Sequence, residues 1–116
     1  MAHVRAVLAS GPGLPGGSPK QGLEMMVPLT PQGRLDEVSL VAADAPPPAR
    51  RFWPDREDWT GVLVATDGGF ALQGNRSRDD PIWAMEAQVF RPGDYITLRR
   101  PNGQELVFRI VLVGAQ

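Results

Sequence analysis

Cysteine is absent from this chain, and histidine and lysine occur once each, as His3 and Lys20. Without cysteine, the chain can form neither a disulfide framework nor a zinc site with thiolate ligands. With a single histidine close to the N-terminus, a Ser-His or Cys-His catalytic pair has almost no base to use. We therefore expect no residues for nucleophilic catalysis and regard an enzyme as the less favoured class.

The sequence also lacks a long apolar run and an excess of either charge. No stretch approaches the roughly 18 apolar residues of a membrane-spanning helix, and the N-terminus lacks the pattern of a secretory signal. The formal net charge is −1, so there is no basic excess to attract nucleic acid or a membrane surface. We expect a soluble, cytoplasmic protein. All basic residues except Lys20 are arginine, which we interpret as the coding bias of a bacterial genome.

Glycine and proline, in contrast, are abundant, with 13 and 12 copies among 116 residues. Because 42% of the residues are apolar, this excess indicates a globular chain with many turns rather than a disordered one. The length predicts a single domain over residues 1–116. Irregular Gly/Pro-rich loops are expected near residues 11–22 and 44–49.

Alternating apolar residues and turn signals predict a mainly β fold, a small antiparallel barrel or sandwich. Residues 3–8 and 38–43 are predicted as strands. In the hairpin around Asp67, the sequence leaves two registers open: Leu63 opposite Leu72, or Val64 opposite Leu72.

The last hairpin has one predicted register, because Pro101, Asn102 and Gly103 suit a three-residue loop. This loop places Leu98 opposite Leu106 and Ile96 opposite Phe108 on one face. On the other face it pairs Arg99 with Glu105 and Thr97 with Val107.

Residues 81–90 fit two secondary structures. Asp80 and Pro81 suit the start of a helix, and Ala84, Met85 and Glu86 favour helix. Alternatively, Trp83, Met85, Ala87 and Val89 form one face of a strand. We favour a short helix at about 81–90 and expect at most one short helix in the fold.

Two spacings resemble ligand-binding motifs without their chemistry. Gly11, Gly13 and Gly16 match G-x-G-x-x-G, but the surrounding prolines remove the donors and prevent the helix that a phosphate site needs. Asn75, Ser77, Asp79, Ile82 and Glu86 match a calcium loop. That loop lacks the required glycine and places two arginines beside the cation. We predict no metal and no cofactor.

Carboxylates are the only other candidates for catalysis. An enzyme that relied on them would need two to meet in one pocket. We expect solvated turns instead. The residues concerned are Asp55, Glu57, Asp58, Asp79, Asp80 and Glu86.

One cluster of arginine and tryptophan stands out as a candidate binding surface, since both types are common in protein interfaces and base-stacking platforms. It comprises Arg50, Arg51, Trp53, Trp59, Arg99 and Arg100. The simplest interpretation is that Trp53 and Trp59 close one end of a barrel while the arginines stay solvated. The functional prediction is a non-catalytic binding module for a protein partner or a second copy of itself. A single-strand nucleic-acid-binding barrel is the alternative, and a carboxylate-dependent enzyme is less favoured.

Overall fold

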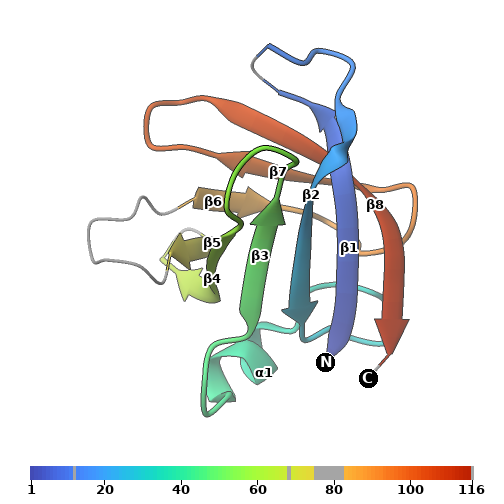
Figure 1. Ribbon diagram of the computed structural model, residues 1–116. Helices are drawn as coiled ribbons and strands as arrows, with labels where there is room; N and C mark the ends of the chain where they lie inside the picture. The colour runs from blue at the N-terminus through green and yellow to red at the C-terminus, as the bar shows by residue number, and fades with distance from the viewer. Residues whose placement is uncertain (12, 68, 75–82, 116) are drawn as a thin grey trace.

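The computed structural model describes residues 1–11, 13–67, 69–74 and 83–115, which form one closed antiparallel β-barrel (Figure 1). Each strand pairs with its neighbours along the chain, and the last strand pairs with the first. The elements are β1 (Ala2–Ser10), β2 (Ser18–Val27), α1 (Glu37–Ala42), β3 (Pro48–Phe52), β4 (Trp59–Thr66), β5 (Gly69–Gly74), β6 (Trp83–Glu86), β7 (Tyr95–Arg99) and β8 (Glu105–Ala115). The prediction of a mainly β, antiparallel fold is confirmed, and of the two predicted architectures, barrel and sandwich, the chain adopts the barrel. In the described part of the chain, no helix has the length and apolarity needed to cross a membrane.

Alternate residues of the strands point inward and fill the barrel with aliphatic and aromatic side chains. The largest fully buried ones include Leu23, Leu63, Leu72, Ile96, Leu98, Phe108 and Ile110. α1 lies at the end where the two chain termini also lie (Figure 1). Leu40 of α1 and Phe90 are buried there. We call this the closed end, and the opposite end, which contains the β1–β2, β3–β4 and β7–β8 connections, the mouth.

Both hairpin registers are resolved. Leu98 pairs with Leu106 and Ile96 with Phe108, which confirms the predicted register of the last hairpin. Gly103 has φ of +89°, the left-handed conformation that its place in the loop requires. In the earlier hairpin, Leu63 lies opposite Leu72, which decides between the two registers that the sequence left open.

The helix predicted at about 81–90 is wrong, because residues 83–86 form the strand β6. Trp83 and Met85 are buried while Ala84 and Glu86 are exposed, so the period is that of a strand. β6 pairs with β5 on one side and β7 on the other. Its hydrogen bonds close the barrel at a point where a helix would leave β5 and β7 each without a neighbour on one side. This requirement outweighs the local helix propensity.

The strand predicted at residues 38–43 is also wrong, since the helix α1 occupies this position. Asp36 caps the helix, its Oδ1 accepting a hydrogen bond from the backbone N–H of Ser39 at 3.2 Å. Only Leu40 is buried, whereas the side chains of Val38 and Val41 are largely exposed. The N-cap Asp36 therefore favours a helix here, and the apolar residues within 38–43 do not form the strand that their pattern predicts.

The two predicted loops are shorter than expected. Residues 18–22 belong to β2, and the β1–β2 register shifts between the pairs Val7–Gly22 and Leu8–Ser18. This irregularity accommodates Pro19, which has no N–H for a regular ladder. Residues 48 and 49 belong to β3, where Pro48 takes the first position, the one a proline tolerates best in a strand.

Candidate functional site

The mouth of the barrel contains a cavity with a volume of about 400 Å³. This size lies within the range of about 300–1,000 Å³ that is typical of small-molecule sites. Its walls come from the end of β1, the β1–β2 connection, the first part of β2, the end of β3 with the residues that follow, and the β7–β8 hairpin. The lining residues are Leu8, Gly11, Leu14, Gln21, Arg51, Trp53, Pro54, Asp55, Arg56, Arg100, Gln104 and Leu106.

Arg51 is the central residue of this mouth. It is an inward-facing residue near the end of β3, and only 6% of its surface is exposed. Its guanidinium carbon lies 4.1 Å from the ring centre of Trp53 and 4.4 Å from that of Trp83. The strand period explains this burial, because Ala49 and Arg51 share the interior face of β3.

Two further arginines extend the stack of guanidinium groups and indoles. Arg100 lies over Trp83 at 4.5 Å, and Arg56 lies over Trp53 at 5.7 Å. Such cation–π contacts stabilise by about 0.5–2 kcal/mol each, depending on how far they are removed from water. Arg100 also donates a hydrogen bond to Oε1 of Gln104 at 3.2 Å, which holds the hairpin tip at the rim.

Three buried donors at the mouth have no acceptor among the described residues: Nη1 of Arg51 and the Nε1 atoms of Trp53 and Trp83. Burial lowers the pKa of Arg51 to about 10, and the positive charges of Arg100 and Arg56 contribute to the decrease. The group is therefore still charged at neutral pH. Among the described residues, no carboxylate forms an ion pair with Arg51.

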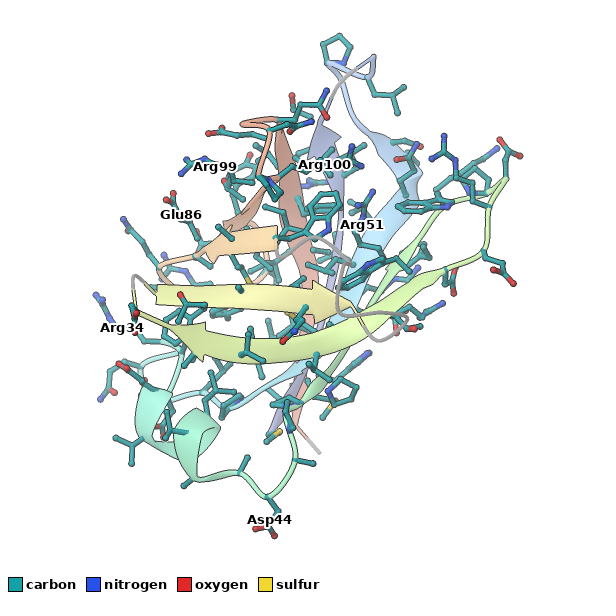
Figure 2. All side chains as sticks on the ribbon, turned by 90° about the vertical axis from the view of Figure 1, so that its left-hand side faces the viewer. Arg34, Asp44, Arg51, Glu86, Arg99 and Arg100 are labelled. Carbon is teal, nitrogen blue, oxygen red and sulfur yellow. The ribbon has the colours of Figure 1, made fainter. Side chains whose placement is uncertain are left out.

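The candidate surface predicted from sequence is divided by the barrel wall. Arg51, Trp53 and Arg100 line the mouth, whereas Arg50 and Arg99 point outward. The cause is the strand period of two, which sends adjacent residues to opposite faces. Figure 2 shows Arg51 and Arg100 close together and Arg99 beside Glu86, away from them.

Both outward arginines are neutralised by carboxylates. Arg50 contacts Glu24 at 2.9 Å and Asp58 at 2.6 Å. Arg99 contacts Glu105 at 2.9 Å and Glu86 at 3.6 Å. Their side chains therefore serve the outer surface of the sheet, in contrast to the two arginines of the mouth.

Trp59, the remaining member of the predicted surface, is half-buried and packs against the apolar core. It lies opposite Arg51 in the β3–β4 ladder. Trp53 lines the cavity and Trp59 packs against the core, and both lie at the mouth end of the barrel. The arginines do not all stay solvated, since Arg51 is buried.

The described carboxylates do not form a catalytic pair in the mouth. Asp58 and Glu86 belong to the outer ion pairs, and Asp55 is the one carboxylate among the described cavity-lining residues. Most of the calcium-like spacing, with Asp79 and Asp80, lies outside the described residues. Within the described part, no three metal-ligating side chains come together.

Sequence reasoning missed two residues of the mouth, Trp83 and Arg56. Trp83 was visible as the first inward residue of a strand alternating with Met85, but the helix interpretation of that segment removed it from consideration. Arg56 lies in the exposed β3–β4 connection, where no periodic signal fixes the direction of a side chain.

The arrangement suits recognition of an anion, because the described residues that line the cavity carry three guanidinium groups and one carboxylate. Comparison with protein-family models, with curated proteins and with solved structures finds no match.

Proposed function

We propose that this barrel is a non-catalytic binding protein that takes a small organic anion into its mouth. The observation that carries the proposal is the buried, charged Arg51, whose Nη1 has no acceptor within the described part of the chain. A buried donor without an acceptor costs about 1–3 kcal/mol, and more when the group is charged. An anionic ligand would remove this cost on binding.

The charge around Arg51 supports the same proposal. Arg56 and Arg100 raise the positive potential of the mouth and repel Arg51, and an anionic ligand would offset this repulsion. The walls are concave and carry apolar residues beside the donors, as small-molecule sites do.

Binding of a protein partner or of a second copy of the chain is a broader version of the proposed function. Every strand of the described barrel has a neighbour on both sides, so a partner has no free sheet edge to extend. The mouth would then have to accept an acidic side chain or a chain terminus from the partner.

Binding of single-stranded nucleic acid is less well supported. Base stacking needs accessible aromatic faces, yet Trp53 and Trp83 each already carry two guanidinium groups. Trp83 is also buried. The two rings therefore serve to hold arginines more than to receive bases.

The adjacent arginines provide a matched test. Tryptophan fluorescence and calorimetry would measure binding of benzoate, phenyl phosphate and an oligonucleotide to the wild type, Arg51→Met and Arg50→Met. We expect small anions to bind the wild type and Arg50→Met alike, and to bind Arg51→Met at least about tenfold more weakly, as loss of a charged hydrogen bond implies. Equal binding to Arg51→Met, or binding of the oligonucleotide alone, would overturn the proposal.

A further inference from the structure

The charge of the mouth restricts the ligand further. The described residues that line the cavity carry three guanidinium groups and one carboxylate, Asp55, which gives a net charge of +2. A singly charged ligand would leave one positive charge uncompensated in a site that is partly removed from water. A doubly charged ligand would neutralise it.

The directions of the donors favour a tetrahedral group. Arg51 reaches the cavity from β3, Arg56 from the β3–β4 connection and Arg100 from the β7–β8 hairpin. The two oxygens of a carboxylate match a single guanidinium edge in one plane. The three terminal oxygens of a phosphate can accept from several directions at once, and the amides of Gln21 and Gln104 stand on the same walls.

The cavity also has room beyond the charged group. Leu8, Leu14 and Leu106 form its apolar part. A Cβ on Gly11 would come within 2.8 Å of a methyl group of Leu106, so the backbone of the β1–β2 connection packs closely against this apolar wall. An uncharged organic portion attached to the phosphate would occupy this space.

Building on the proposed function, we propose that the ligand is a small phosphate monoester, bound as the dianion. Arg51, Arg56 and Arg100 hold the phosphate, and the ester's organic portion lies against Leu8, Leu14 and Leu106. The ligand class is small phosphorylated molecules, since a cavity of about 400 Å³ encloses one of moderate size.

The test uses phenyl phosphate, phenyl sulfate, benzoate and inorganic phosphate, with affinities measured by calorimetry on the full chain between pH 5 and 7.5. A phosphate monoester gains its second charge with a pKa of about 6, whereas phenyl sulfate stays singly charged. We expect phenyl phosphate to bind about tenfold more weakly at pH 5 than at pH 7.5. Phenyl sulfate should bind weakly at every pH, and inorganic phosphate should bind more weakly than its phenyl ester.

Asp55→Asn removes the carboxylate of the described cavity wall, so a pH dependence that remains in this variant belongs to the ligand. Among the described residues, the other lining side chains include no carboxylate or histidine, and His3 lies on the outer face beside Glu24. The variant should keep the pH dependence of phenyl phosphate and bind it more tightly. Loss of the pH dependence in this variant would overturn the proposal that the phosphate monoester binds as the dianion.

The remaining outcomes distinguish the two proposals. Equal, pH-independent binding of phenyl sulfate and phenyl phosphate would overturn the phosphate monoester and leave the anion-binding mouth intact. Inorganic phosphate binding as tightly as phenyl phosphate would overturn the role of the apolar wall. No Arg51-dependent binding of any of these anions would overturn the proposed function itself.

Discussion

Arg51 shows how the environment of a single residue can conflict with the stability of the fold. Its guanidinium is enclosed by Trp53 and Trp83, and its Nη1 nevertheless lacks an acceptor among residues 1–11, 13–67, 69–74 and 83–115. The pKa of Arg51 falls to about 10 because burial and two neighbouring arginines disfavour its charged form. A group in this situation opposes folding, which is typical of sites kept for binding.

We therefore expect Arg51→Met to raise the free energy of unfolding by about 1–3 kcal/mol in ligand-free protein. The cost of the buried charge disappears and methionine keeps most of the packing, which outweighs the lost cation–π contacts. Thermal and chemical denaturation at pH 7 would measure the change. Arg50→Met is the control and should lower stability, since its ion pairs with Glu24 and Asp58 are lost. A less stable Arg51→Met would contradict this account.

At the scale of elements, the outer face of β1, β2 and β3 is held together through Glu24. His3 and Arg5 on β1 and Arg50 on β3 all contact this carboxylate. Arg5 and Arg50 also lie over the ring of Phe52, at 4.7 and 5.2 Å. One side chain of the middle strand thereby links both of its neighbours.

The ionisation of Glu24 should make this linkage depend on pH. Burial by itself would raise the pKa of Glu24, but the hydrogen bond with His3 and the charges of Arg50 and Arg5 hold it below the usual value of 4.5. A lowered pKa in the folded state means that the contribution is complete above about pH 4.5 and is lost as the pH falls below it.

Urea denaturation between pH 3 and 7 would measure this effect for the wild type and Glu24→Gln. The variant should be less stable at pH 7 by about 1–3 kcal/mol, the scale of hydrogen bonds to a charged group. The difference should shrink towards pH 3. A constant difference across this range would show that Glu24 acts through packing rather than charge.

The elements also show how far the sequence could predict the fold. Turn chemistry and side-chain pattern agreed for the last hairpin, and its register was correct. They disagreed at residues 83–86, where Ala84, Met85 and Glu86 favour helix, and the need to close the barrel decided the outcome. Closure of the barrel depends on strands that are distant in the sequence, so it cannot be predicted from a short segment alone.

The candidate site was predicted in composition but not in arrangement. The sequence identified the adjacent arginines Arg50 and Arg51, yet it could not tell which one faces the interior. That depends on the phase of β3, which is set by its pairing with β2 and β4. Trp83 was missed for a related reason. The direction of its side chain is set by the strand β6, and the local sequence favoured a helix in that segment.

At the scale of the whole molecule, the barrel is closed by the pairing of β1 with β8. Ala2 lies opposite Ala115, so the chain ends are adjacent in the ladder, at the closed end and away from the mouth (Figure 1). Paired strands place such residues about 5 Å apart, a distance that a short linker spans.

A circular permutant with the ends joined by a Gly/Ser linker and opened between Ala45 and Pro46 should fold with the same strand order. The new ends lie in an exposed connection at the closed end, so the mouth is preserved. Circular dichroism would measure folding, and anion binding would test the mouth. A permutant opened between Phe108 and Arg109 is the control and should not fold, because it cuts through β8. Folding of the second permutant alone would contradict the importance of this seam.

The adjacent arginines of β3 have a consequence for comparing related chains. Since Arg50 and Arg51 are chemically identical, an alignment shifted by one position would still match arginine with arginine and score well. The two places are nevertheless opposite in role, one in the mouth and one in an outer ion pair. Ala49, buried among the core residues, marks the correct phase. The repeated arginine thus conceals which of the two residues faces the mouth, and the position of the buried Ala49 identifies it.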